Sequence, residues 1–137
     1  MSEFPRLLHT VLDAEDPRSL AEFYRQFLGL RYRSGDKPPV DGGPDDADWL
    51  VLIDAEGRRT LAIQQTDELT PTTWPDPAVP MQLHLDFTVP DTEALETHRA
   101  RALELGARQL FDRTDDPDEP LYVLADPAGH PFCVFVA

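Results

Sequence analysis

Two histidines occupy matching places in two stretches of the sequence. His9 lies in Leu8-His9-Thr10 and His84 lies in Leu83-His84-Leu85, and each histidine precedes an aspartate by seven residues. Imidazole nitrogens are common ligands of divalent metal ions. If two copies of one structural unit faced each other, these two side chains could begin a metal site. The sequence leaves open the alternative that each is a hydrogen-bonded histidine on a half-buried strand.

The stretch around His84 alternates between polar and apolar residues. Because every second side chain of a strand points to the same face, four polar side chains would share one face: Gln82, His84, Asp86 and Thr88. Asp86 could supply a carboxylate ligand, or it could hold His84 by a hydrogen bond and set its tautomer. A polar strand face either meets bulk water or lines a polar cavity. We expect a cavity here, with His84 and Asp86 as a functional pair.

Four other residues could also contact a ligand. Gln64 ends a strand pattern, where it could form hydrogen bonds in a cavity. Cys133 is the only cysteine, and we expect a small buried apolar residue in preference to a nucleophile or a ligand. Trp49 and Tyr122 are either core residues or aromatic walls of a cavity, and the sequence does not distinguish the two.

A helix pattern follows each histidine stretch. Asp16 is placed to cap the first helix, Pro17 suits its first position, and Gly29 suits its end. Between them runs one broad apolar stripe: Leu20, Phe23, Tyr24, Phe27 and Leu28. Asp91 and Gly106 bound the second helix in the same way.

Three short strand patterns follow each helix, so that each half has the order strand, helix, strand, strand, strand. The strand patterns cover 30–34, 49–54 and 60–65 in the first half, and 107–111, 121–125 and 132–136 in the second. We therefore predict one domain over residues 1–137. Module one (4–66) and module two (81–137) would be joined by a proline-rich linker (67–80).

The composition is that of a folded domain with an acidic surface. The chain has 137 residues, with 41% hydrophobic and 28% charged side chains and a formal net charge of −14. This charge argues against nucleic acid and against anionic membranes as partners. No stretch is apolar enough to span a bilayer, and no signal-peptide pattern opens the sequence. One cysteine cannot form an internal disulfide, and we expect a cytoplasmic protein.

The order of these motifs resembles a known superfamily. The segments Asp16 to Tyr24, Leu28-Gly29-Leu30 and Leu124 to Phe132 resemble the vicinal oxygen chelate superfamily, which includes glyoxalase I, extradiol dioxygenases and bleomycin-resistance proteins. Through Leu61-Ala62-Ile63-Gln64 and Leu83-His84-Leu85-Asp86 the chain is similar, more narrowly, to the actinobacterial glyoxalase-like domain group. The resemblance covers nearly the whole chain.

The resemblance implies an α+β fold in which two tandem βαβββ modules form a cup-shaped mixed β-sheet, the glyoxalase/bleomycin-resistance/dioxygenase fold. It also implies one divalent ion (Zn, Fe, Mn or Ni) with a ligand position near the start and the end of each module. His9 and His84 match the early positions and Gln64 falls near a late one. Cys133 falls where metal enzymes of the superfamily usually carry glutamate. Because that glutamate also moves the proton in glyoxalase I, glyoxalase I activity is not expected.

We therefore predict that the chain binds a small oxygenated or aromatic molecule in the cup, with metal-assisted lyase, isomerase or dioxygenase chemistry. One alternative is a metal-free protein that sequesters its ligand, as bleomycin-resistance proteins do, and the acidic surface would attract cationic compounds. Another is an interaction domain with an empty cup. Related proteins and open sheet edges suggest a homodimer. The predicted binding residues are His9, Trp49, Gln64, His84, Asp86, Tyr122 and Cys133, with His9, His84 and Gln64 as metal ligands.

Overall fold

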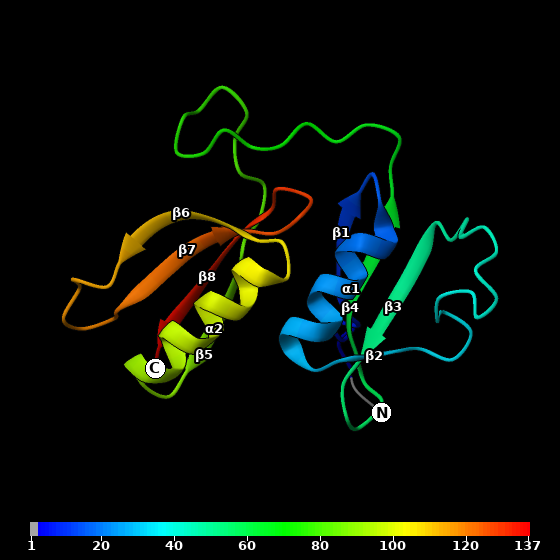
Figure 1. Cartoon of the computed structure of the whole chain (residues 1–137), viewed down its shortest axis with the longest axis horizontal. Helices are drawn as coiled ribbons and strands as arrows, with labels where there is room; N and C mark the ends of the chain where they lie inside the picture. Colours follow the sequence, from blue (N-terminus) through cyan, green and yellow to red (C-terminus); the bar gives the residue numbers. More distant parts are fainter. Residues whose placement is uncertain (1–2) are drawn as a thin grey trace. The chain divides into compact units, whose positions relative to one another are not determined.

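The computed structural model describes residues 3–137, which form two compact units of the same βαβββ order. The first unit ends at Asp67 and the second begins at Glu68 (Figure 1). Each unit has its own helix and its own four-stranded sheet. The predicted pair of βαβββ modules with mixed sheets is confirmed.

The first unit contains β1 (Thr10–Ala14), α1 (Pro17–Leu28), β2 (Arg31–Tyr32), β3 (Trp49–Ile53) and β4 (Arg59–Gln65). Its sheet has the order β1-β4-β3-β2, in which β1 and β4 are parallel and the other neighbours are antiparallel. The second unit contains β5 (Leu85–Val89), α2 (Thr92–Glu104), β6 (Arg108–Arg113), β7 (Leu121–Ala125) and β8 (Pro131–Val136). Its order, β5-β8-β7-β6, repeats that of the first unit.

Both helices begin at the predicted aspartates. The Asp16 carboxylate accepts a hydrogen bond from Ser19 N at 3.2 Å, and the Asp91 carboxylate accepts one from Ala94 N at 2.8 Å. Each bond satisfies a backbone donor that has no partner within the helix. At the end of α1, Gly29 has a φ of 69°, a conformation that other residues adopt only with strain.

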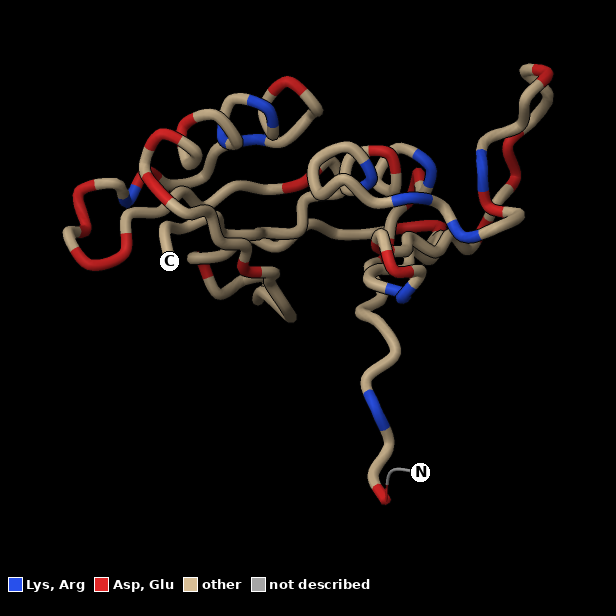
Figure 2. Tube along the Cα trace, turned by 90° about the horizontal axis from the view of Figure 1, so that it is seen from below, with Lys and Arg blue, Asp and Glu red and all other residues tan. Residues whose placement is uncertain are grey.

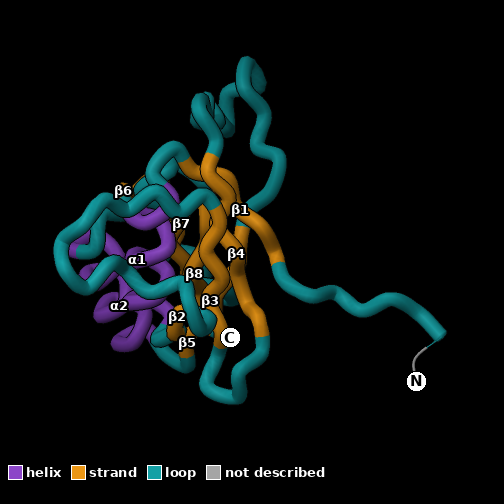
Figure 3. The backbone as a smooth tube through the Cα atoms, turned by 90° about the vertical axis from the view of Figure 1, so that its right-hand side faces the viewer, coloured by secondary structure: helices purple, strands orange, loops and turns teal. Residues whose placement is uncertain are grey.

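Each helix packs on one face of its own sheet (Figure 3). In the first unit the helix side holds buried apolar side chains: Leu12, Leu50, Leu52, Leu61 and Ile63. In the second unit the corresponding side chains are Val89, Leu124, Phe132 and Val134, with Leu95 and Ala102 from α2. Because strand side chains alternate, the residues between them project from the opposite face. The candidate site lies on that opposite face of the second sheet.

The proline-rich segment before β5 forms a folded loop of the second unit. Thr72 Oγ1 donates to Val79 O at 2.6 Å, and Val79 N donates to Thr73 Oγ1 at 2.9 Å. The Trp74 ring meets the Phe111 ring of β6 edge to face, with centroids 5.7 Å apart. Part of the predicted linker therefore packs on a strand.

Neither helix of the described residues is long and apolar enough to cross a membrane.

Candidate functional site

Three side chains with metal-binding atoms come together on the second sheet, and we call them the donor cluster: His84, Asp86 and Cys133. Their ligand atoms all lie within 4.8 Å of one another. Asp86 of β5 is the register partner of Cys133 of β8, and His84 directly precedes β5. Because of strand alternation, all three side chains project from the face opposite α2. The predicted pairing of His84 with Asp86 is also seen, with Nε2 and Oδ1 3.3 Å apart.

The donor cluster is open to a ligand at one end and half-buried at the other. The side chains of His84 and Asp86 are 42% and 51% exposed, whereas Cys133 is half-buried. Burial raises the pKa of the Cys133 thiol to about 11, and the Asp86 carboxylate adds to the shift through its charge and a hydrogen bond. At neutral pH the sulfur is therefore a thiol. A thiol is a weaker nucleophile than a thiolate.

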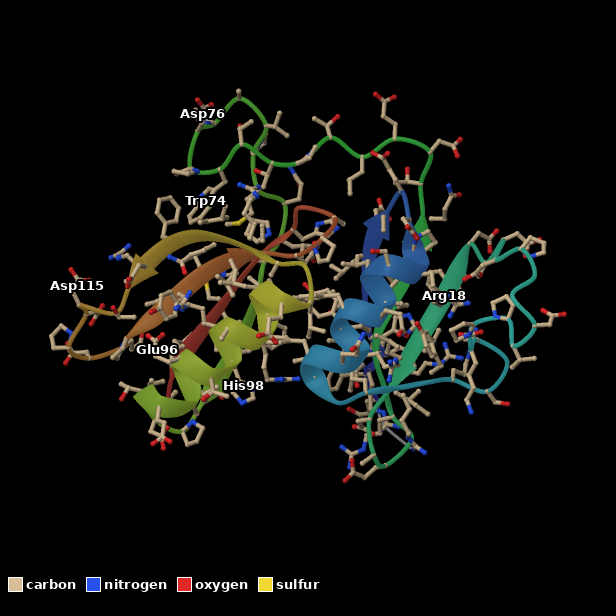
Figure 4. The ribbon with its side chains drawn as sticks, viewed as in Figure 1. Arg18, Trp74, Asp76, Glu96, His98 and Asp115 are labelled. Carbon is tan, nitrogen blue, oxygen red and sulfur yellow. The ribbon has the colours of Figure 1, made fainter. Side chains whose placement is uncertain are left out.

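The same row of the sheet continues from the donor cluster to two aromatic rings. Cys133 pairs with Val123 of β7, and Val123 pairs with Phe111 of β6, so these side chains share a face. Trp74 contacts Phe111, and Figure 4 shows it reaching from the loop toward β6. Phe111 is 37% exposed, which is high for a large apolar side chain. We call Trp74 and Phe111 the aromatic pair.

The aromatic pair was not predicted from the sequence. Trp74 lies in a segment interpreted as a linker, and Phe111 ended a strand pattern whose pairing partners were unknown. A register shift between Gln109 and Phe111 also interrupts the regular pairing of β6 with β7. Simple alternation along the sequence therefore does not give the face on which Phe111 lies. Phe111 lies within β6, and its exposure becomes visible only in the structure.

Tyr122 lies on the other face of the sheet, so that of its two alternatives, core residue or aromatic wall, the structure has the core position. It is the register partner of Val134, on the α2 side of the sheet. Its hydroxyl donates to the Glu96 carboxylate, and the Arg99 guanidinium lies 5.0 Å from its ring centre. Figure 4 labels Glu96 on α2. Burial, followed by the hydrogen bond to Glu96, raises the pKa of Tyr122. Its role is to pack the helix onto the sheet.

In the first unit, His9 directly precedes β1 and contacts Trp49. Their ring centres are 5.9 Å apart at an angle of 55°. Burial lowers the pKa of His9, and the positive charges of Arg59 and Arg33 lower it further. Its Nδ1 is buried without a hydrogen-bond partner among the described residues. The lowered pKa favours the neutral form of His9, in which imidazole binds metals.

Gln64 does not occupy the place in the first unit that Cys133 occupies in the second. The register partner of Ala62 is Val11, just as the partner of Cys133 is Asp86. Gln64 lies two residues further along β4, opposite Asp13 on one side and Trp49 on the other. The first sheet therefore has Val11 and Ala62 where the second has a carboxylate and a thiol. Whether His9, Gln64 and His84 share one site stays a prediction.

The donor cluster fits a divalent ion by its chemistry. Imidazole, carboxylate and thiolate are all zinc ligands, and atoms bonded to one ion at about 2.0–2.3 Å lie roughly 3.3–3.8 Å apart. Donor atoms within 4.8 Å of one another need only small side-chain rotations to reach that spacing. The raised thiol pKa means that binding through Cys133 would release a proton, so that the affinity for metal would rise with pH.

Comparison with solved structures places the fold among known proteins. One similar structure is that of a glyoxalase/bleomycin resistance protein/dioxygenase family enzyme from Burkholderia phytofirmans PsJN. The two sequences are 16% identical over 94% of this chain and 96% of that chain, and the TM-score is 0.68. A possible glyoxalase from Bacillus cereus is 18% identical over 94% and 96% of the two chains, with a TM-score of 0.63.

A third similar structure contains ligands. It is a mutant of the fosfomycin resistance protein FosX from Listeria monocytogenes, complexed with Mn(II) and 1S,2S-dihydroxypropylphosphonic acid. It is 17% identical over 98% of this chain and 93% of that chain, with a TM-score of 0.69. No curated protein matches the sequence significantly.

These identities are low enough that the solved structures establish only the fold. The family itself is established by the sequence, because the model of the glyoxalase-like domain matches residues 9–135, nearly the whole chain. This protein therefore belongs to the glyoxalase-like domain family.

Proposed function

We propose that the second unit binds a small oxygenated or aromatic molecule on the sheet face opposite α2. The observation that carries this proposal is the common row of the donor cluster and the aromatic pair. Neighbouring strands lie about 4.8 Å apart, so Phe111 on β6 and Asp86 on β5, three strands away, are separated by about 14 Å. A ligand of that length could place an apolar ring against Trp74 and Phe111, and its polar end against His84 and Asp86.

The polar end would orient the ligand through hydrogen bonds. The Asp86 carboxylate is half exposed and can accept a bond from a ligand N–H or O–H. The Cys133 thiol lies beside it and can donate only weakly. As a protonated thiol, Cys133 cannot act as the general base that a carboxylate would be at this position. We therefore do not propose glyoxalase I activity.

We further propose that a divalent ion can be held by His84 and Asp86, with Cys133 as a third ligand. Such an ion would act as a Lewis acid on a ligand oxygen. The Mn(II) complex of the FosX mutant supports this proposal, because that protein has the same fold. Lyase, isomerase or dioxygenase chemistry on an oxygenated substrate would be consistent with this arrangement.

A metal-free binding protein is the second candidate, and one observation favours it. The Cys133 pKa of about 11 makes the third ligand costly to deprotonate at neutral pH. His84, Asp86 and Cys133 would then form a polar subsite without an ion, and the protein would sequester its ligand without changing it.

Cobalt(II) titration of the full-length protein tests the metal proposal. We expect saturation at one ion per chain, with a charge-transfer band from the Cys133 thiolate. His84→Ala and Asp86→Asn should each weaken binding by about a hundredfold, because each removes one of few ligands. His98→Ala is the matched control, since His98 lies on α2 and contacts Arg101. Failure to saturate, or an equal effect of His98→Ala, would leave the metal-free candidate.

Ligand binding is tested separately by the fluorescence of Trp74. Trp49→Phe leaves Trp74 as the only tryptophan of the chain. A panel of phenols, diketones and cationic aromatic compounds should contain a ligand that changes this fluorescence saturably and raises the melting temperature. Phe111→Ala should abolish the response. If no compound acts on either signal, the proposed ligand site is wrong.

A further inference from the structure

The first unit contains a groove outside the face that carries the candidate site. It has a volume of about 730 Å³ and lies between the second half of α1, β2, the loop that follows β2, and the end of β3. Small-molecule sites typically have volumes of about 300–1,000 Å³. All lining residues lie between Glu22 and Ile53, so the groove belongs wholly to the first unit.

The groove is positively charged, although the chain as a whole is acidic. The formal charge of the chain is −14, and Figure 2 shows acidic positions on both units. The groove is nevertheless lined by three cationic side chains, Arg25, Arg31 and Lys37, and by the single carboxylate of Glu22. Lys37 is the only lysine of the chain.

Glu22 is already neutralised by groups of the protein. Its carboxylate accepts bonds from Arg25 Nε at 2.7 Å and Arg25 Nη2 at 2.9 Å, and one from the Tyr32 hydroxyl at 2.6 Å. The bonds from Arg25 are the main reason why the pKa of Glu22 is lowered. The charge of Arg25 is thus already balanced by the ion pair with Glu22. The positive charges of Arg31 and Lys37 are therefore left over in the groove.

Arg31 and Lys37 have donors to spare. One Arg31 nitrogen, Nη2, donates to Asp54 O at 3.3 Å. No ion pair involves Arg31 or Lys37 among residues 3–137. Both side chains are exposed, so they can rotate toward a ligand without first breaking packing contacts in the core.

The backbone that carries Lys37 is held in place by the preceding residue. Asp36 O accepts from Arg18 Nη1 at 2.6 Å, and Asp36 Oδ2 accepts from Val51 N at 2.9 Å. Arg18 also lies 5.0 Å from the centre of the Tyr32 ring. The loop beside the groove is thus anchored to α1 and β3, which reduces the entropy that ordering it would cost on binding.

The floor of the groove is apolar. Leu30 and Tyr32 are buried to within a tenth of their surface, and Ile53 is half-buried. A ligand for this groove therefore needs an apolar body as well as a negative group. We propose that the groove binds a small aromatic or aliphatic carboxylate, whose oxygens are bound by Lys37 and Arg31 and whose body lies on Leu30, Tyr32 and Ile53.

Benzoate titration of the intact protein, followed by NMR, tests this site. Because Lys37 is the only lysine, its Cε signal can be assigned without ambiguity after selective labelling. We expect a saturable benzoate-dependent shift with a dissociation constant in the millimolar range, measured at constant ionic strength. Benzylamine has the same ring and the opposite charge, and it should produce no saturable shift. Inorganic phosphate lacks the apolar body and should bind more weakly than benzoate.

Matched charge variants complete the test. Lys37→Met and Arg31→Gln should each weaken benzoate binding by about fivefold, the loss expected for one exposed ionic contact. Binding to Lys37→Met is followed through the backbone amides of 31–36. Arg58→Gln removes the same charge from the exposed β3–β4 turn, outside the groove, and should leave binding unchanged. Equal losses in all three variants, equal binding of benzylamine, or no saturation by benzoate would overturn the proposal.

Discussion

The two units have the same architecture and different chemistry at equivalent positions. Both sheets have the same strand order, and in both a histidine directly precedes the first strand. In the second unit the next residue on that face is Asp86, paired with Cys133, whereas in the first it is Val11, paired with Ala62. The repeated fold therefore fixes where a side chain points but not what it can do. Four predictions test this comparison, starting with the largest expected effect.

Equivalent core residues should be costly to truncate in both units. Leu61 and Phe132 occupy equivalent register positions beside β1 and β5, and they are 4% and 0% exposed. We expect Phe132→Ala to lower the free energy of unfolding by about 3–5 kcal/mol and Leu61→Ala by about 2–5 kcal/mol, measured by urea denaturation. Val40→Ala, at a fully exposed loop position, should change it by less than about 0.5 kcal/mol. A small effect at Phe132 would contradict the described packing.

Exchanging the differing pair should move the proposed metal site between units. Asp86→Val with Cys133→Ala gives the second unit the residues of the first, and we expect at least about a hundredfold loss of cobalt affinity. Val11→Asp with Ala62→Cys does the reverse and should raise the stoichiometry from one ion to two, because the lowered pKa of His9 favours its neutral form nearby. Ala62 is fully buried, so the added sulfur should cost about 1–3 kcal/mol of stability. An unchanged stoichiometry would show that the histidine position alone does not complete a site.

The helix caps should contribute alike in both units. Asp16→Ala and Asp91→Ala each remove one carboxylate that accepts a bond from the first turn of a helix. We expect each variant to lose about 1 kcal/mol of unfolding free energy, as measured by thermal and urea denaturation. Asn at either position should restore most of this loss, since its side-chain oxygen can accept the same bond. A loss in only one unit would break the equivalence of the two helices.

The fourth prediction concerns the pH dependence of stability caused by the Cys133 thiol. Its folded pKa is raised from 9.0 to about 11, so the folded state keeps a proton that the unfolded chain releases. The stabilisation is complete below pH 9 and is lost as the pH rises through 11. We expect unfolding free energy to fall over this interval, and to fall less steeply in Cys133→Ala. Asp86→Asn should lower the thiol pKa, observed by ultraviolet absorption of the thiolate, because it removes a negative charge nearby.

The features that the sequence predicted well are encoded by short-range signals. Asp16 and Pro17 indicate the start of α1 through the residue types that favour the first positions of a helix. Strand alternation places His84 and Asp86 on one face, where their side chains lie 3.3 Å apart. The features that the sequence left open or did not indicate depend on contacts between distant segments. Tyr122 turns toward α2 because its partner across the sheet is Val134, and Trp74 meets Phe111 only when the loop folds back onto β6. Neither contact produces a periodic pattern in the sequence from which it could be predicted.

The anchoring of Asp36 also has a practical consequence. The acidic loop between β2 and β3 is attached at its beginning, through the bonds of Asp36 to Arg18 and Val51, while Val40 further along is fully exposed. Lengthening a flexible loop costs little free energy when its ends stay fixed. A short tag or a fluorescent reporter inserted after Val40 should thus be tolerated without disrupting either sheet. Such an insertion would allow this protein to be detected in mixtures.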